Sequence, residues 1–391
     1  MKILYICHEP LPSPHTNTEQ AVKSLAALCR ETTYKIDLVC PKKIIPGLNK
    51  LSYLEHVADF YDVPSSIFEN GIHLIERPIP FFIPGKIGRL YHDILAVFYG
   101  KRYEYDLVYT RDPATLAFSL AIGKKTVFET YRYDFITAIK YIWWRKFCTS
   151  HDKLAGIITH SEKTRRFFLQ AGIPPDKVIT AYNGGPSNRQ VFRTRPESAR
   201  RKLTLPESKN ILIYSGHINR KKGLGVLIEM ARLLENVQFF LVGGLNGSAE
   251  VKKITRLIKR MGLSNISLIP RVPPSQIFLF LSAADLLVIP PTSRPMKRFK
   301  RTVIPMKTFL YLAAGKPILA PDLPDIKEIL KDRHNAILVP PDSPRESAIA
   351  IRNLFKDKIL QEKLKKQALN DSRLYTWQKR GKKIAEFLER I

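Results

Sequence analysis

Cysteine is scarce in this chain of 391 residues, which holds four. None of them stands in a Cys-x-x-Cys pair or at a spacing typical of metal ligands, which argues against a zinc site and a disulfide framework. Cys7 and Cys40 fall in apolar runs that read as strands. We therefore expect buried free thiols in a reducing cytoplasm.

Long apolar runs are missing as well. A membrane-spanning helix needs roughly 18 consecutive apolar residues, and runs such as 117–122 and 277–290 are interrupted before that length. The first run, 2–7, ends before a proline-rich stretch and is too short for the core of a signal peptide. We expect a cytoplasmic protein, either freely soluble or peripheral at the inner face of the cell membrane.

Acidic residues are few relative to basic ones. The chain has 64 Lys and Arg against 35 Asp and Glu, a formal net charge of +29. Up to residue 190 the net charge is +7, and beyond it +22. Such an excess favours a polyanionic partner: nucleic acid, an anionic membrane surface or a phosphorylated substrate. Without a zinc finger, helix-turn-helix or aromatic RNA motif, we expect no specific nucleic-acid partner. Evenly scattered surface lysines are the alternative.

Short apolar runs alternate with helical periodicity, which favours doubly wound parallel sheets. In the first half we expect strands at 2–7, 35–40, 72–76, 107–109, 126–129 and 156–159, and helices at 19–28 and 161–170, the latter capped by Ser161. In the second half we expect strands at 211–214, 238–242, 266–268, 285–289 and 317–320, and helices at 226–234, 249–261, 275–282 and 306–314.

The periodic pattern stops between residues 183 and 206, where arginines and prolines replace it. We place a linker there, because a chain of this length exceeds one ordinary core. The fold class is therefore α/β, with two Rossmann-like doubly wound domains at 1–188 and 189–375. Two such domains would face each other across a cleft at the carboxyl ends of their sheets.

A basic loop between a strand and a helix stands out in the second half. The run 211–214 leads to Gly216 and His217, and Lys222 and Gly223 precede the next helix. Unpaired backbone N–H groups at a helix start suit an anionic group, most often a phosphate. A solvated basic turn is the alternative.

The chain as a whole resembles a GT-B glycosyltransferase, most closely the retaining family 4 group. The matching segments occur in the family's order along nearly the full length: 157–161, 178–184, 214–223, 241–244, 283–290, 305–317, 322–324 and 335–339. The tail at 375–377 and the basic amphipathic helix after it resemble the closing helix that returns to the first domain. Residues 376–391 would then belong with 1–188.

The resemblance implies transfer of a hexose-like sugar from a nucleotide-sugar donor, without a metal or cofactor. Lys222 would neutralise charge on the leaving diphosphate, and His217 would donate to a phosphate. Other donor-binding positions implied by the resemblance are Gly216, Gly223, Gly243, Gly244, Arg271, Val272, Pro305, Met306, Lys307 and Thr308.

The sequence departs from the family pattern at the donor site. Members usually carry a glutamate that binds ribose hydroxyls where this chain has Leu310, and many carry another where it has Thr302. Leucine cannot accept a hydrogen bond, so ribose binding would weaken by perhaps 1–3 kcal/mol unless another polar residue takes the role.

Acceptor-side positions are suggested by two segments. The loop before the first helix carries His15 and Asn17, which would line the cleft, or else Thr16 or Thr18 would merely cap the helix. Glu129 ends a strand whose family counterpart often carries a histidine two residues after the glutamate, and Tyr131 takes that place here. We take Glu129 as a candidate catalytic residue with no proton-transfer role assigned, and Asn183 as a further acceptor-side residue.

Two basic stretches could contact a membrane or a phosphorylated acceptor. Five basic residues lie between Arg294 and Arg301. The stretch 141–146, which contains Trp143 and Trp144 and follows the aromatic segment 131–135, is typical of an interfacial contact. A solvated basic run and a buried helix face are the respective alternatives.

Three functions follow for comparison. The first is an active retaining glycosyltransferase that acts on a glycan or lipid-linked acceptor in cell-surface polysaccharide or glycolipid synthesis. The second is a non-catalytic GT-B scaffold that binds a nucleotide or a partner protein, indicated by Leu310 and Thr302. The third is a polyanion binder, indicated only by net charge. We favour the first.

Overall fold

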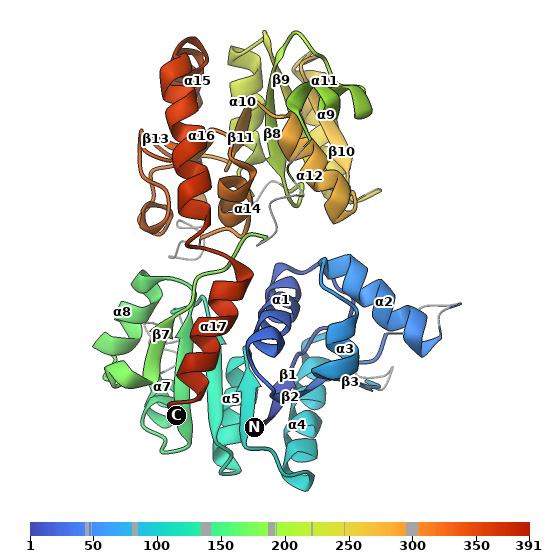
Figure 1. The fold of residues 1–391 in the computed structure, drawn as a ribbon, viewed down its shortest axis with the longest axis vertical. Helices are drawn as coiled ribbons and strands as arrows, with labels where there is room; N and C mark the ends of the chain where they lie inside the picture. The colour runs from blue at the N-terminus through green and yellow to red at the C-terminus, as the bar shows by residue number, and fades with distance from the viewer. Residues whose placement is uncertain are drawn as a thin grey trace. The chain divides into compact units, whose positions relative to one another are not determined.

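The computed structural model describes residues 1–43, 47, 49–79, 85–133, 142–186, 192, 194–219, 222–245, 247–294 and 304–391. The chain forms two compact units: unit 1 is Met1–Asn183 with Trp377–Ile391, and unit 2 is Gly184–Thr376. Each unit is built on one parallel sheet covered by helices (Figure 1). The predicted α/β class with two Rossmann-like sheets is confirmed.

Unit 1 contains a sheet of seven strands in the order β3-β2-β1-β4-β5-β6-β7. Its elements are β1 Lys2–Ile6, α1 Thr16–Glu31, β2 Lys35–Pro41, α2 Lys50–Tyr61, α3 Ser66–Asn70, β3 Ile72–Arg77, α4 Gly85–Arg102, β4 Leu107–Thr110, α5 Pro113–Ala121, β5 Thr126–Thr130, α7 Ile142–Thr149, β6 Leu154–Thr159, α8 Glu162–Gln170, the 3₁₀ turn Pro175–Lys177, β7 Val178–Thr180 and α17 Trp377–Leu388.

Unit 2 contains a sheet of six strands in the order β10-β9-β8-β11-β12-β13. Its elements are α9 Pro196–Lys202, β8 Asn210–Ser215, α10 Leu224–Leu233, β9 Val237–Gly244, α11 Ala249–Arg260, β10 Ile266–Pro270, α12 Pro274–Ala283, β11 Leu286–Val288, α14 Lys307–Ala314, β12 Ile318–Pro321, the 3₁₀ turn Ile326–Glu328, β13 Ile337–Val339, α15 Pro344–Lys356 and α16 Lys358–Ser372.

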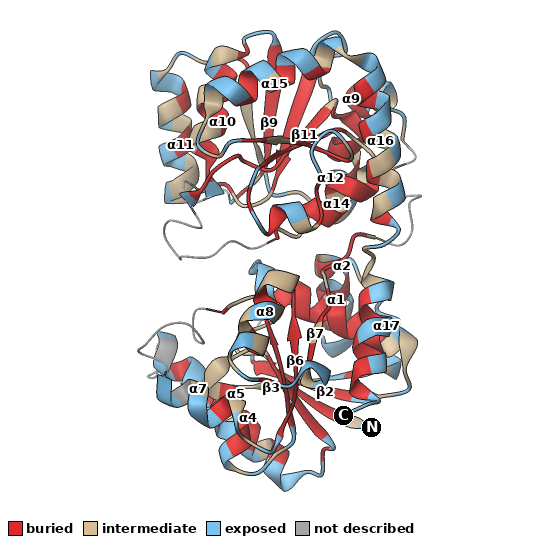
Figure 2. Ribbon diagram, turned by 90° about the vertical axis from the view of Figure 1, so that its left-hand side faces the viewer, coloured by how far each residue is buried: buried red, intermediate tan, exposed pale blue. Residues whose placement is uncertain are grey.

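The strands of unit 1 are apolar on both sides because helices cover both faces of the sheet (Figure 2). Along β1, Ile3 and Tyr5 pack into the core that contains α1, whereas Leu4 and Ile6 pack into the core that contains α4. Successive side chains of a strand point to opposite faces. This alternation gives unit 1 two hydrophobic layers.

Several sequence predictions need correction. Residues 183–206 are not all linker, because α9 lies inside that range. Arg200 fastens α9: its Nε donates to the Ala283 carbonyl at 3.0 Å, and its Nη2 lies 2.7 Å from an Asp285 carboxylate oxygen. Neither Thr16 nor Thr18 caps α1, whose N-cap is His15 without a side-chain hydrogen bond. Ser161 does cap α8, accepting from the Thr164 N–H.

The sequence also predicts buried free thiols and no membrane-spanning helix. All four cysteines are free; Cys40 is buried, but Cys7 is only partly so. Within the described residues, none of the helices combines the length and apolar character needed to cross a bilayer.

Candidate functional site

Two glycines bring the carboxyl ends of β8 and β9 together in unit 2. Gly216 and Gly243 have φ values of 135° and 123°. Residues other than glycine rarely adopt such values. The Gly216 N–H donates to the Val242 carbonyl at 2.8 Å. A Cβ on Gly243 would lie 2.4 Å from the Gly216 carbonyl oxygen. The strand ends can approach this closely only with glycine at position 243.

Lys307 reaches this glycine turn from the start of α14. Its Nζ lies 3.6 Å from the centre of the Tyr214 ring, and a Cβ on Gly216 would lie 3.0 Å from the same Nζ. Burial, and then the charge of Lys222, hold the pKa of Lys307 well below its usual range. Among the described residues no carboxylate pairs with Lys307. The turn therefore presents a lysine side chain that has no carboxylate partner in the described part of unit 2.

Lys222 supplies the second positive charge and lies at the entry to α10. Its backbone N–H donates to the Asn219 carbonyl and side-chain oxygens, each at 3.1 Å. The next residue, Gly223, has a φ of 81°, and a Cβ there would lie 2.2 Å from a methyl carbon of Thr292. Thr292 in turn donates to Asp342 at 2.8 Å. The turn that presents Lys222 is thus held against the rest of unit 2.

The other predicted donor-side residues surround this turn at the strand ends of unit 2. The His217 carbonyl accepts from the Tyr214 hydroxyl at 2.9 Å. The Arg271 N–H donates to the Gly244 carbonyl at 2.8 Å, and Val272 follows it. Pro305 and Met306 lead into α14, where Thr308 is fully buried and its Oγ1 lacks a hydrogen-bond partner among the described residues.

Of the two positions that depart from the family pattern, Leu310 lies within the described residues and Thr302 does not. Leu310 lies in the first turn of α14 and is partly exposed. Beside it, the Tyr311 hydroxyl accepts from the Ser215 N–H at 2.8 Å. Thr302 and the basic stretch after Arg294 lie outside the described residues.

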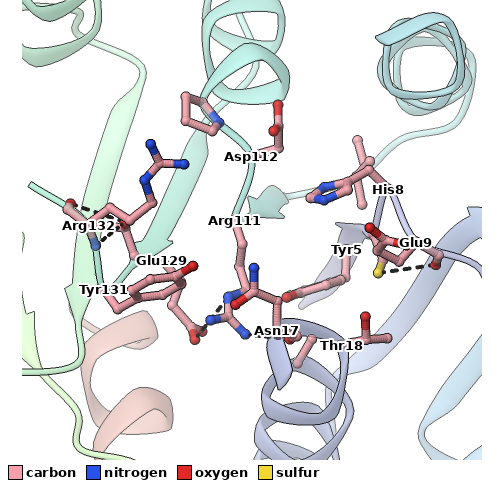
Figure 3. A pocket seen from close by; sticks show the side chains of 15 residues that line it. Tyr5, His8, Glu9, Asn17, Thr18, Arg111, Asp112, Glu129, Tyr131 and Arg132 are labelled. Atoms are coloured by element: carbon pink, nitrogen blue, oxygen red, sulfur yellow. Dashed lines mark hydrogen bonds and ion pairs between the residues drawn. The ribbon is translucent and has the colours of Figure 1, made fainter. Parts of the chain in front are cut away.

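A cavity of about 160 Å³ opens in unit 1 at the carboxyl ends of β1, β4 and β5 (Figure 3). Strand order reverses between β1 and β4, and ligands of open parallel sheets bind at such a switch point. Its lining residues are Tyr5, Ile6, Cys7, His8, Glu9, Asn17, Thr18, Ala21, Arg111, Asp112, Pro113, Glu129, Thr130, Tyr131 and Arg132.

Three of the predicted acceptor-side residues, Asn17, Glu129 and Tyr131, line this pocket. The other two do not. His15 is exposed, with its Nε2 3.9 Å from a Glu9 carboxylate oxygen. Asn183 is buried at the end of unit 1, with its Oδ1 unpaired among the described residues.

Glu129 is the buried acceptor of a charged network. Arg380 Nη2 lies 2.8 Å and His160 Nε2 2.7 Å from its Oε1, Arg111 Nε lies 3.5 Å away, and the Tyr109 hydroxyl donates to Oε2. Burial alone would raise the pKa of Glu129, but Arg380, Arg111 and the His160 hydrogen bond outweigh it and hold the pKa far below its usual range. A carboxylate so paired favours positioning rather than proton transfer.

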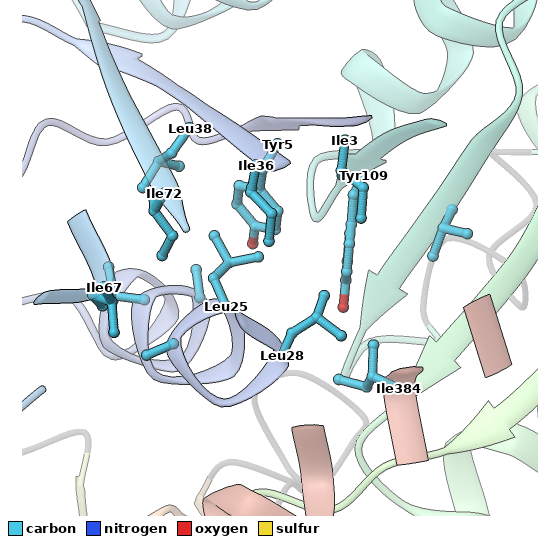
Figure 4. Close-up of a cluster of buried hydrophobic side chains, with 14 of the residues drawn as sticks. Ile3, Tyr5, Leu25, Leu28, Ile36, Leu38, Ile67, Ile72, Tyr109 and Ile384 are labelled. Atoms are coloured by element: carbon cyan, nitrogen blue, oxygen red, sulfur yellow. The ribbon is translucent and has the colours of Figure 1, made fainter. Parts of the chain in front are cut away.

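Arg380 comes from α17, which packs against α1 on the face of the sheet opposite α4. A Cβ on Gly381 would lie 2.5 Å from the Ala27 carbonyl, so the two helices touch backbone to backbone. Figure 4 shows Ile384 of α17 next to Leu28 of α1 and below Tyr109. Arg380 also donates to Ser24 Oγ at 2.8 Å. The carboxyl-terminal segment therefore reaches the pocket through Glu129.

Sequence reasoning missed several residues of this pocket. The hydroxyls of Tyr5 and Thr18 are buried and have no hydrogen-bond partner among the described residues. Arg111 donates to the Asn17 carbonyl at 2.7 Å and to Gln20 Oε1 at 2.6 Å. Arg111 directly follows a buried strand, and such a position was a usable signal because strand ends form the ligand edge of a parallel sheet.

One group of side chains at this edge could hold a metal ion. Ligand atoms of His8, Asp93 and Asp112 lie within 4.8 Å of one another. Both carboxylates already have protein partners: Asp93 accepts from Thr115 Oγ1 at 3.0 Å, and Asp112 caps α5. These contacts explain the cluster as part of the fold.

A cationic glycine turn in one Rossmann-like unit and a polar pocket in the other define a two-domain α/β protein of the GT-B type. Comparison with known families agrees. Residues 19–188 match the model described as Glycosyltransferase Family 4, and residues 196–371 match the model described as Glycosyl transferases group 1. The chain belongs to the GT-B glycosyltransferases of family 4 and group 1.

Individual relatives are distant. A D-inositol 3-phosphate glycosyltransferase from Nocardioides is 23% identical over 245 residues, which cover 56% of this chain and 52% of the relative. The chain thus matches about half the length of such curated relatives. The solved sucrose-phosphate synthase from Thermosynechococcus elongatus has a TM-score of 0.77 at 17% identity and covers 100% of this chain and 98% of its own. Anabaena HepE, solved with UDP and glucose, has a TM-score of 0.73 at 19% identity, and both chains are covered completely.

Proposed function

We propose that the protein is a glycosyltransferase that moves a sugar from a nucleotide-sugar donor to a glycan or lipid-linked acceptor, with retention at the transferred carbon. Its place would be in the synthesis of a cell-surface polysaccharide or glycolipid. The donor diphosphate binds at the Gly216 turn of unit 2. The acceptor hydroxyl belongs to the pocket of unit 1.

The observation that carries the donor assignment is the pair of lysines at Gly216, for which the described residues supply no carboxylate partner. Lys307 is partly buried, it lies beside the turn, and the charge of Lys222 acts on it. Lys222 is exposed and Lys307 partly buried; withdrawing even part of a charge from water without a partner is costly, so such a pair favours a bound anion. Two negative phosphate groups match two ammonium groups, and the glycines leave room for them to approach the backbone.

The same lysines would stabilise the departing diphosphate. As the bond between the sugar and the diphosphate breaks, negative charge grows on the phosphate oxygen, and preorganised positive charge there stabilises the transition state. Lys222 and Lys307 supply that charge. We therefore expect activity to persist when divalent cations are removed with EDTA.

The donor class is supported by two solved structures of one similar protein. Anabaena HepE has been solved with UDP and glucose, and also with UDP-glucose. Their folds match this chain over its whole length. We take UDP-sugars as the first donors to test and the phosphorylated cyclitol named by the Nocardioides relative as the first soluble acceptor.

A non-catalytic scaffold is the second candidate, and Leu310 is the observation that favours it. A leucine in the first turn of α14 cannot accept a hydrogen bond from ribose. In this case nucleotide would bind without turnover.

A thermal-shift panel of UDP, GDP, ADP, CMP and their sugar conjugates tests the donor site. A ligand at 100 times its dissociation constant adds about 2.7 kcal/mol of stability. We expect one nucleotide family to stabilise the protein and Lys222→Ala and Lys307→Ala each to remove the shift. Lys259→Ala, an exposed lysine of α11 in the same unit, is the matched control.

Release of free sugar from the stabilising nucleotide sugar separates the two candidates. Slow hydrolysis that both lysine variants abolish supports the transferase. Binding without hydrolysis, and without transfer to any acceptor, supports the scaffold. Stabilisation by no nucleotide, or stabilisation that survives both lysine variants, refutes the donor site.

A further inference from the structure

The outer face of α4 is apolar although it faces away from the sheet. Ile87, Leu90, Tyr91 and Phe98 follow a spacing of three, four and seven residues, which places them along one side of the helix. Ile87 is 69% exposed and Phe98 52% exposed. The opposite side of α4 is occupied by buried residues, among them Ala96 and Val97, which pack on β1 and β4. The exposed stripe is therefore additional to the core.

α7 continues this apolar face on the same side of the sheet. Trp143 is 81% exposed, and Phe147, one helical turn further on, is also exposed. α5 packs between α4 and α7 and adds the exposed Phe118. Figure 2 shows the three helices in a row along one side of the unit 1 sheet. A buried helix face, the alternative explanation for Trp143, is ruled out.

The concentration of exposed apolar side chains on these helices is unusual. Eight of the fifteen large exposed hydrophobic residues that the structure describes lie on α4, α5 and α7, which are 18, 9 and 8 residues long. Single exposed apolar residues are ordinary, but a gathered set marks an interaction surface. We call this set of three outer helix sides the α4–α5–α7 face.

The charge on this face is of one sign. The three helices contain a single acidic residue, Asp93, which is buried. Lys101 and Arg102 of α4 and Lys146 of α7 are exposed, whereas Arg89 lies on another side of α4 and pairs with Glu9 at 3.0 Å. Lys146 holds its Nζ 6.0 Å from the centre of the Trp143 ring. Long basic side chains beside aromatic ones are typical of helices that lie in a bilayer interface, where the apolar part inserts and the charge meets phosphate.

A second copy of the chain is a poor occupant for this face. In a symmetric dimer the same patch meets itself, so the basic side chains would face one another without acidic partners. An anionic lipid surface complements both the charge and the apolar stripe.

We infer that the α4–α5–α7 face docks the protein on an anionic lipid bilayer. The apolar side chains enter the interface, while Lys101, Arg102 and Lys146 contact lipid phosphates. This inference does not depend on the proposed transfer reaction, because none of these residues belongs to the lysine turn or lines the pocket.

Flotation of the full chain with lipid vesicles tests the inference. We expect binding to vesicles of phosphatidylcholine mixed with phosphatidylglycerol and much weaker binding to phosphatidylcholine alone. The double variant Phe98→Ser with Trp143→Ser should weaken binding by roughly tenfold or more, because two large side chains no longer leave water. Its two positions are exposed, so the fold and the nucleotide-induced thermal shift should be retained.

Ile359→Ser is the matched control, since Ile359 is 86% exposed on α16 of unit 2. It removes an equally exposed apolar side chain away from the face and should leave binding unchanged. In addition, tryptophan emission should shift to the blue on addition of anionic vesicles, and Trp143→Phe should remove most of that shift.

Three results would overturn the inference. The first is no flotation with anionic vesicles at low salt. The second is flotation that the double variant leaves intact, because the basic charge of the whole surface would then suffice. The third is a dimer in sedimentation, or a complex with an acidic protein, that the double variant dissolves while vesicle binding is absent.

Discussion

Arg380 and Glu129 form a fully buried ion pair, with 2.8 Å between Nη2 and Oε1, although 251 positions separate them in the chain. The pair joins the last helix of the protein to the end of β5. Through the same carboxylate it reaches Arg111, which lines the pocket of unit 1. The carboxyl-terminal helix thus holds a pocket-lining carboxylate in place without lining the pocket itself.

Arg380→Gln should destabilise the protein by about 3–5 kcal/mol, because it leaves Glu129 buried with a weaker set of partners. The measurement is the free energy of unfolding in urea. Lys383→Ala, three residues further along α17 and exposed, is the control and should change this free energy by less than about 0.5 kcal/mol. Equal effects of the two variants would mean that the ion pair does not hold the helix.

Acid should destabilise the protein because His160 is buried in its neutral form. Burial lowers the pKa of His160 to about 4, against the opposing effect of Glu129. As the pH falls, this histidine therefore binds a proton near pH 6.5 in the unfolded chain but only at lower pH in the folded chain. Stability from this group is complete above pH 6.5 and falls by on the order of 1–2 kcal/mol between pH 7 and pH 5.

His160→Gln keeps a donor for Glu129 and removes the titration, so the slope of unfolding free energy against pH should flatten in this range. His56→Gln, at an exposed position of α2, should leave the slope as it is. A slope in His160→Gln that equals that of the unchanged protein would contradict this account.

Gly243→Ala should destabilise the protein strongly, whereas Gly225→Ala should stabilise it slightly. The added Cβ at Gly243 meets the Gly216 carbonyl at 2.4 Å, and its φ is positive, whereas nothing lies within 4 Å of the position at Gly225 in α10. We expect Gly243→Ala to cost about 2 kcal/mol or more and to abolish nucleotide binding. Gly225→Ala should stabilise by about 0.5–1 kcal/mol. Urea unfolding and the thermal-shift panel measure both effects.

Leu310→Glu should strengthen binding of the nucleotide that the panel identifies. Leu310 is partly exposed, so a carboxylate there would keep contact with water, and it would accept from ribose hydroxyls. A gain of about 1–3 kcal/mol corresponds to roughly 5- to 150-fold in the dissociation constant. Leu374→Glu, at an exposed position of unit 2, controls for added charge. If titration calorimetry shows no gain, the ribose contact lies elsewhere.

Much of the fold was predictable because its signals are local. Apolar runs and helical periodicity located most strands to within two residues of their observed ends, since strand and helix patterns act between near neighbours. The Gly216 and Lys222 loop was likewise readable, because the strand, the turn and the helix start are contiguous. α9 was missed because its fixing partner, Asp285, lies 85 positions away.

The pocket of unit 1 shows which contacts could not be predicted from the sequence. Asn17, Glu129 and Tyr131 were found, but the role of Glu129 depends on Arg380, and no local pattern links the two. Tyr5 and Thr18 look like core and helix residues in the sequence. Their unpaired hydroxyls become visible only when β1 and α1 are packed side by side.

The sequence by itself determined the α/β class, the family and the positive charge, because composition, periodicity and ordered motifs are properties of the chain alone. Tertiary structure decided which groups share a site. It carried Lys307 to the Gly216 turn, paired Arg380 with Glu129 and left Trp143 in solvent. The reason is physical: ion pairing, desolvation and exposure depend on distances between residues far apart in the chain, and packing alone sets those distances.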